Sequence, residues 1–115
     1  MTFHDQLQHA IDSWNQDPIE DEWLFEKFRE RFVNRMSAKD AFEAIDETVE
    51  LLLHQSDEST AIEVLQTLIA LARQSNTTEI PSNLLAQRPA IATQFSTFGD
   101  YARNKLQELF RHYRL

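Results

Sequence analysis

A single glycine in 115 residues is the feature that most constrains what this chain can fold into. Tight turns between β-strands depend on glycine, because it adopts positive φ angles without steric cost, and proteins carry about 7% glycine on average. No window of the sequence shows a sustained alternation of apolar and polar residues. Apolar residues instead recur at intervals of three and four, which is typical of amphipathic helices. We therefore expect an all-α protein of five or six helices.

Apolar spacing and capping residues predict three helices in the first half of the chain. The first covers residues 2–15. The second begins at Asp17, a capping residue followed by a proline suited to the first turn, and it runs to Met36. A segment that resembles a capping box starts at Ser37 and opens a third helix, which ends near His54. The buried residues expected in these helices are Phe3, Leu7, Ala10, Ile11, Trp14, Leu24, Phe25, Phe28, Phe32, Met36, Ala41, Phe42, Ile45, Val49, Leu52 and Leu53.

The second half predicts a central helix followed by shorter ones. Capping residues within 55–59 precede a fourth helix whose apolar residues cover about half of its circumference, so we expect it to be the most buried. Residues 75–82 form a loop, and Pro89 interrupts the helix that begins near Ser82. Ile91, Phe95 and Phe98 then predict a short helix that Gly99 closes. A last helix starts near Asp100 and continues to the chain end. Its apolar residues and those before it predict burial of Ala61, Ile62, Val64, Leu65, Leu68, Ile69, Leu71, Ala72, Ile91, Phe95, Phe98, Ala102, Leu106, Leu109, Phe110 and Tyr113.

Residues 1–115 are long enough for one domain with its own core. Two topologies fit the predicted helices. One is an irregular bundle, and the other is a short stack of helical hairpins in which residues 38–74 form one pair. The sequence shows no repeat at a fixed period.

Composition excludes several classes of function. A net charge of −8 argues against general binding to DNA or RNA, because affinity for phosphate backbones depends on Lys and Arg. The absence of cysteine removes disulfides, thiolate metal ligands and thiol nucleophiles. Neither a secretory signal nor an apolar run of membrane-spanning length is readable. We therefore expect a cytoplasmic protein that binds neither nucleic acid nor membranes.

The acidic residues are concentrated in two stretches that contain no base. Residues 1–26 hold seven acids, and residues 40–72 hold eight. Between them, residues 27–39 carry five basic residues, which are spread around the predicted second helix. Five carboxylates of the third helix fall within an arc of about 120°, opposite its apolar side. These are Asp40, Glu43, Asp46, Glu47 and Glu50.

This acidic arc has two interpretations. It is either a docking surface for a basic protein, since complementary charge speeds encounter, or a solvated face that maintains solubility. In the docking interpretation, Asp57 and Glu58 in the following turn extend the surface. Trp23 is a second candidate contact, because tryptophan is enriched at interface hot spots, although packing against the first helix would also explain it.

The acidic helix also invites an enzymatic alternative. Carboxylates at Glu43, Asp46, Glu47 and Glu50 could hold Mg²⁺, and their spacing resembles half of the EExxE and ExxD pattern of all-α nucleotide pyrophosphohydrolases such as the MazG family. The other half is missing, because the fourth helix offers Glu63 without a second acid three residues later. The sequence contains no nucleophile elbow or phosphate-binding glycine loop. We expect no catalytic residue, metal ligand or cofactor.

The segment from Asp40 to Leu85 is similar to a known class of helical hairpin. It contains a helix, the turn QSDES, a second helix ending in LIALARQS, and the sequence NTTEIPSNLL. This pattern resembles the hairpin of HEAT-like proteins, and the TTEIP turn resembles that of small HEAT-like immunity proteins made by bacteria against polymorphic toxins. The resemblance implies a non-enzymatic protein that binds and blocks a basic toxin domain. A helical adaptor or regulatory protein is the alternative, and the oligomeric state stays open.

Overall fold

The computed structural model describes residues 2–16 and 22–115, and this part of the chain contains helices and no strand. The predicted start of the second helix at Asp17 lies outside the described residues. The helices are α1 (Phe3–Gln16), α2 (Leu24–Phe28), the π-helical segment η1 (Arg29–Val33), α3 (Ala38–Leu53), α4 (Glu58–Gln74), α5 (Ser82–Phe95) and α6 (Asp100–His112). The all-α prediction is confirmed.

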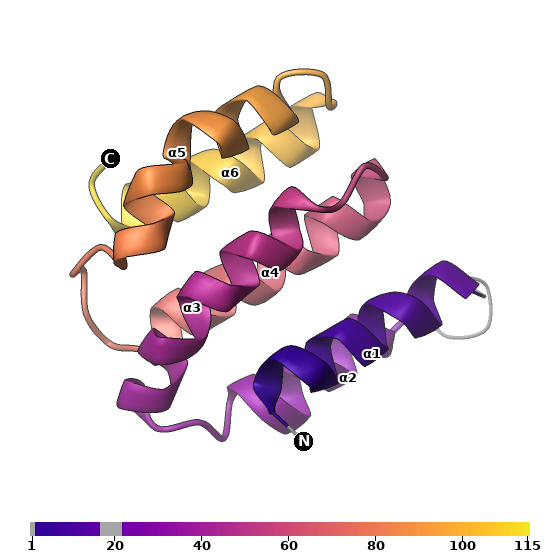
Figure 1. The fold of residues 1–115 in the computed structure, drawn as a ribbon, viewed down its shortest axis with the longest axis vertical. Coiled ribbons are helices and arrows are strands. Elements are labelled where there is room, and N and C mark those ends of the chain that lie inside the picture. The colour runs from indigo at the N-terminus through magenta and orange to yellow at the C-terminus, as the bar shows by residue number, and fades with distance from the viewer. Residues whose placement is uncertain (1, 17–21) are drawn as a thin grey trace.

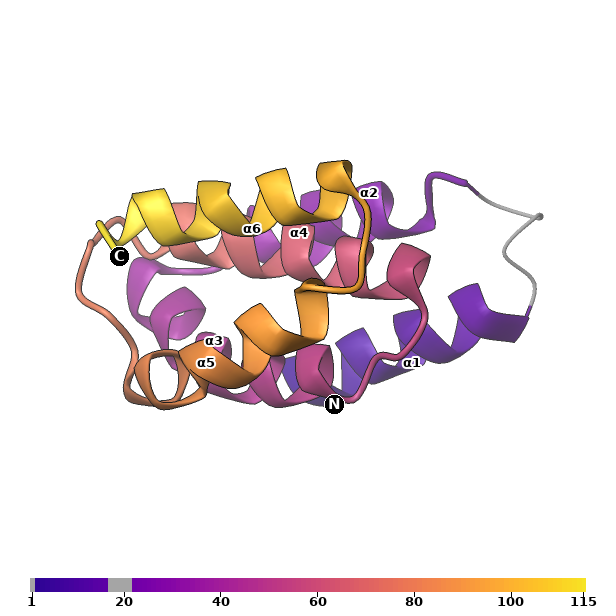
Figure 2. The ribbon, with the colours of Figure 1, turned by 90° about the horizontal axis from the view of Figure 1, so that it is seen from above.

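The helices form three antiparallel pairs stacked side by side (Figure 1). The pair of α3 and α4 lies in the middle, flanked by α1 with α2 and η1 on one side and by α5 with α6 on the other. Helices α1, α3 and α5 form one layer, while α2, η1, α4 and α6 form the second (Figure 2). The extents of 37 × 34 × 18 Å agree with a slab two helices thick. Of the two predicted topologies, this arrangement is the stack of hairpins.

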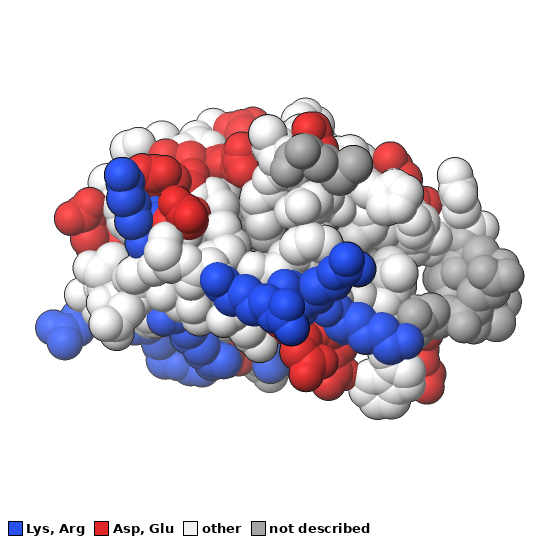
Figure 3. All heavy atoms as spheres, turned by 90° about the horizontal axis from the view of Figure 1, so that it is seen from below, with Lys and Arg blue, Asp and Glu red and all other residues white. Residues whose placement is uncertain are grey.

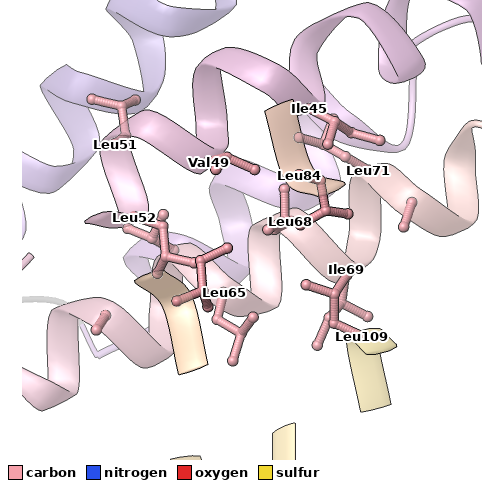
Figure 4. Packing of buried hydrophobic residues seen from close by; sticks show 14 of the residues in the cluster. Ile45, Val49, Leu51, Leu52, Leu65, Leu68, Ile69, Leu71, Leu84 and Leu109 are labelled. Atoms are coloured by element: carbon pink, nitrogen blue, oxygen red, sulfur yellow. The ribbon is translucent and has the colours of Figure 1, made fainter. Parts of the chain in front are cut away.

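The core lies between the two layers and is centred on α4 (Figure 4). Leu65, Leu68 and Leu71 of α4 are fully enclosed, and they meet side chains from α3, α5 and α6. Helix α4 contributes nine buried residues, which confirms that it is the central helix. The core also contains residues that apolar spacing had not singled out, namely Val33, Ala44, Thr48, Leu51, Thr60, Thr67, Ser75 and Leu84.

The predicted starts of the two central helices are confirmed in detail. Ser37 caps α3, because its hydroxyl accepts a hydrogen bond from the backbone N–H of Asp40 at 3.1 Å. Asp57 caps α4 in the same way through the N–H of Thr60 at 2.9 Å. Each cap satisfies one of the N–H groups that a helix start leaves without an intrahelical partner.

The second predicted helix differs from the structure in its winding. We expected a regular α-helix, but after Phe28 the chain continues as a π-helix, with a backbone hydrogen bond from Asn34 to the carbonyl of Arg29 five residues earlier. The wider turn inserts one residue into the helical repeat. As a result, Val33 is enclosed in the core, whereas Phe32, predicted to be buried, is only half-buried.

The predicted interruption at Pro89 is wrong, because α5 is continuous through it. Proline lacks the N–H that would bond the carbonyl of Leu85, and this loss normally breaks a helix. Here both residues are exposed on the outer side of the molecule, so water can reach that carbonyl. Leu84 and Ile91 anchor the helix on its inner side.

The predicted role of Gly99 is also wrong. Helix α5 ends at Phe95, and Gly99 occupies the capping position at the start of α6, in an extended conformation with φ −74° and ψ 175°. A helix-closing glycine needs a positive φ, and Gly99 does not have one. Its N–H donates to the carboxylate of Glu58 at 2.9 Å.

Candidate functional site

The five carboxylates of α3 divide into two groups according to which neighbour they contact. At about 100° per residue, Asp46 and Glu50 occupy one edge of the arc, and Glu43 follows them. Glu47 and Asp40 complete the other edge. Helix α5 packs beside the edge that carries Asp46 and Glu50. It does not bind the edge that carries Glu47 and Asp40.

Asp46 and Glu50 bind the start of α5. One carboxylate oxygen of Asp46 accepts the backbone N–H of Asn83 at 3.1 Å, and the other accepts the hydroxyl of Ser82 at 3.4 Å. The side-chain amide of Asn83 donates in return to the backbone carbonyl of Asp46 at 2.9 Å and to the Glu50 carboxylate at 3.0 Å. Since Pro81 cannot cap α5 with its own side chain, Asp46 supplies the missing acceptor. These two residues have a structural use.

Asp40, Glu43 and Glu47 form the second group, which we call the α3 acidic surface. Within the described chain, no hydrogen bond or ion pair engages any of their three carboxylates. Asp40 and Glu43 are exposed and Glu47 is half-buried. Carboxylates that have no internal partner remain available to an external cation.

A shallow hollow of about 250 Å³ adjoins the α3 acidic surface. Half-buried Phe42 lies in its wall, together with Glu43 and Lys39 of α3. Glu79, from the segment between α4 and α5, also lines the hollow and adds a further exposed carboxylate. The hollow therefore offers an aromatic contact beside two carboxylates and the ammonium of Lys39.

Asp57 and Glu58 lie at the other end of α3 and serve the fold. Asp57 caps α4, and its carboxylate also accepts the hydroxyl of Thr60 at 3.1 Å. Glu58 accepts the N–H of Gly99 at the start of α6. Residues 41–53 of α3 separate this turn from Asp40, which corresponds to about 20 Å of helix. The structure therefore does not gather all predicted carboxylates into one surface.

Trp23 precedes α2 and is 55% exposed. It belongs to the layer of α2, α4 and α6, whereas the α3 acidic surface belongs to the other layer. Trp14, not Trp23, packs against Phe25 of α2, with ring centroids 5.3 Å apart. Trp23 is thus an exposed aromatic at a place distinct from the acidic surface.

The donor set expected of the enzymatic alternative is not assembled in the described residues, where no three Asp, Glu or His side chains are placed to hold a metal ion. Glu63 instead faces Arg29 of η1, with 3.7 Å between the guanidinium and the carboxylate. Arg29 also donates to the Gln66 side chain at 3.3 Å. Burial raises the pKa of Glu63, and the positive charge of Arg29 opposes that rise.

The basic residues of α2 and η1 lie in different environments. Arg29 points toward α4, whereas Lys27 and Arg31 line a groove between α1 and α2 with η1. Viewed from that side, Lys and Arg side chains gather in a band across the middle of the molecule (Figure 3). The four-residue spacing of Lys27 and Arg31 indicates that they share one face of a helix. The sequence gives no indication of the π-helical turn in which Arg31 lies.

No protein-family model matches this chain, and neither do any of the curated proteins or solved structures compared with it. None of the helices in the described residues combines the length and apolar character needed to cross a bilayer.

Proposed function

We propose that this chain is a non-enzymatic protein that binds a basic protein partner through the α3 acidic surface. One observation carries the proposal: Asp40, Glu43 and Glu47 form no hydrogen bond or ion pair with the described chain, while the neighbouring Asp46 and Glu50 are both bound to α5. Like charges at Glu43 and Glu47, one turn apart, cost on the order of 0.2 to 0.5 kcal/mol in a helix. A cationic partner would remove that repulsion.

The partner that we propose is a basic bacterial toxin domain, which the chain neutralises by covering its active surface. Support comes from the similarity of residues 40–85 to hairpins of HEAT-like immunity proteins. The stacked helical pairs are compatible with it, because such stacks present extended faces for binding proteins. The hollow beside Phe42 supplies an apolar contact within the charged surface.

Capture of the partner followed by an activity assay tests this proposal. The chain is immobilised, exposed to a lysate of its source organism at low salt, and eluted at high salt, because an interface of this kind weakens as salt screens it. The eluted protein is identified by mass and its activity is measured with and without a stoichiometric amount of the chain. Inhibition supports immunity. A partner that stays fully active in the complex would instead identify the chain as an adaptor.

A further inference from the structure

The groove between α1 and α2 with η1 lies on the outer side of the first helical pair. Its volume is about 420 Å³. On α1, Leu7 and Ile11 are enclosed by the neighbouring helices, and His9 and Ser13, which line the groove, lie about 160° to 240° around the helix from them. The groove therefore opens away from α3 and α4, at the end of the stack.

The floor of the groove is apolar and aromatic. Phe28 and Phe32 pack with ring centroids 4.9 Å apart, and Leu24 and Ala10 complete the surface. Phe32 and Leu24 are only half-buried. End units of helical stacks normally present a polar outer face, so an apolar groove at this position departs from what solubility alone requires.

The rim of the groove is basic. Arg31 and Lys27 stand one helical turn apart on the same wall, and His9 lies on the α1 wall. The guanidinium of Arg31 lies over the Phe32 ring at 5.2 Å, and within the described residues no carboxylate forms an ion pair with it. This is the face across which the basic band runs in Figure 3. The rim has the opposite sign to the whole molecule, whose net charge is −8.

The dimensions of the groove match a helix. Its α1 wall extends from Gln6 to Ser13 and its other wall from Leu24 to Phe32, which correspond to about 10 and 12 Å of helix. Two helical turns of a ligand, with apolar residues at i, i+3 or i+4 and i+7, span the same length. An open trough between two helices encloses little of a small molecule, whereas sites for small ligands bury about 70–90% of them.

We propose that this groove binds an acidic amphipathic helix of a protein partner. The apolar side of that helix would cover Phe28, Phe32 and Leu24, and a carboxylate on its flank would pair with Arg31. The helix would extend the stack by one more element, packed on α1 and α2 as α3 and α4 are on their inner side. This inference does not rest on the proposed function, because the α3 acidic surface takes no part in the groove.

Titration of the isotope-labelled chain with designed peptides, followed by amide chemical shifts, tests the inference. The probe is a peptide of about 18 residues with Leu at helical i, i+3, i+4 and i+7 spacing and Glu at the flanking positions. A second peptide carries Lys in place of every Glu, and a third arm uses octanoate as a small anionic amphiphile. We expect the acidic peptide to shift the amides of α1, α2 and η1, and the Lys peptide to leave them unshifted.

Variants on the two walls make the test specific. Arg31→Glu and Ser13→Glu should each lower the affinity for the acidic peptide by about tenfold or more, because a carboxylate of the chain then faces a carboxylate of the peptide. Arg111→Glu, an exposed change on α6 that alters the net charge as much as Arg31→Glu does, should bind the acidic peptide as the wild type does. Dispersed amide spectra of each variant verify the fold. The inference is overturned by unchanged affinity in both wall variants, by shifts outside the groove, or by binding of octanoate without the acidic peptide.

Discussion

Asp46 caps a helix to which it does not belong. Its carboxylate receives the N–H of Asn83 and the hydroxyl of Ser82, at the point where Pro81 leaves α5 without a side-chain acceptor of its own. The five acids of α3 therefore differ in role, because Asp46 and Glu50 bind α5 and the other three do not. A charge pattern on a helix wheel shows exposure relative to that helix alone.

The cap makes Asp46 far more important for stability than Glu43. We expect Asp46→Ala to lower the free energy of unfolding by about 1 to 2 kcal/mol, as loss of a helix cap does. Glu43→Ala, which removes no hydrogen bond or ion pair within the described chain, should stay within about 0.5 kcal/mol of the wild type. Urea unfolding followed by circular dichroism compares the two. Equal losses in both variants would contradict the structural assignment of Asp46.

We expect the ionisation of Tyr113 to make the protein less stable at alkaline pH. Its side chain is buried, its hydroxyl has no hydrogen-bond partner in the described chain, and burial together with the nearby charge of Asp46 raises its pKa to about 12. In the unfolded chain a tyrosine ionises near about pH 10. The folded state therefore retains a proton that the unfolded state has lost, and the free energy of unfolding falls as pH rises from about 10 to about 12.

Replacement of Tyr113 by Phe removes this ionisation at no cost in hydrogen bonds. We expect Tyr113→Phe to unfold with a shallower pH dependence than the wild type between about pH 10 and pH 12. Urea unfolding at several alkaline pH values measures the difference. Parallel pH profiles for the two proteins would show that Tyr113 ionises equally easily in the folded and unfolded states.

At the scale of elements, helix ends are satisfied by side chains from neighbouring helices. Gln74 of α4 donates to the carbonyl of Met36 at 2.6 Å, and Gln94 of α5 donates to the carbonyls of Leu52 and Gln55 at 2.7 and 2.8 Å. With Asp46 and Glu58 acting at helix starts, these contacts connect successive elements of the stack. The carbonyls at the end of a helix lack intrahelical donors, so each such contact fixes one helix against another.

Local sequence signals predicted most of the elements because those signals act within one helix. The caps at Ser37 and Asp57 and the apolar face of α4 depend on neighbours three or four residues away. Three features depend on contacts with other helices, and the local pattern therefore did not indicate them. They are the π-helical winding of η1, the continuity of α5 through Pro89, and the position of Gly99 at the start of α6. The candidate site divided for the same reason, since Asn83 was an unforeseen partner of Glu50.

Pro89 provides a prediction about α5. Pro89→Ala restores an N–H that can bond the Leu85 carbonyl, and alanine is far more favourable than proline inside a helix. The unfolded chain gains some freedom, which offsets part of this effect. We expect a net increase in the free energy of unfolding of about 1 to 2 kcal/mol, measured by urea unfolding. As a control, Ala90→Pro, a change at the neighbouring exposed position, should strongly lower the free energy of unfolding. If Pro89→Ala were less stable than the wild type, the packing of α5 would require the proline.

On the scale of the whole molecule, the stack separates charges of opposite sign. The α3 acidic surface and the Glu79 carboxylate lie at the start of the central pair, and the basic rim of Arg31 and Lys27 lies at the outer side of the first pair. The slab is 18 Å thick, so both features belong to one small body. A protein with a net charge of −8 can thus offer two surfaces to partners of different charge.

The central claim is that the α3 acidic surface binds the partner. Capture of the partner by the wild-type chain and by charge-reversed variants tests this claim most directly. The wild-type chain, a variant with Asp40, Glu43 and Glu47 each changed to Lys, and a control with Asp12, Glu22 and Glu30 each changed to Lys are immobilised in parallel. The two variants have the same net charge, and circular dichroism verifies that each is folded. The quantity measured is the amount of partner retained from the same lysate at low salt. We predict that the wild type and the control retain the same protein and that the α3 variant loses it. Equal retention by all three would contradict the claim.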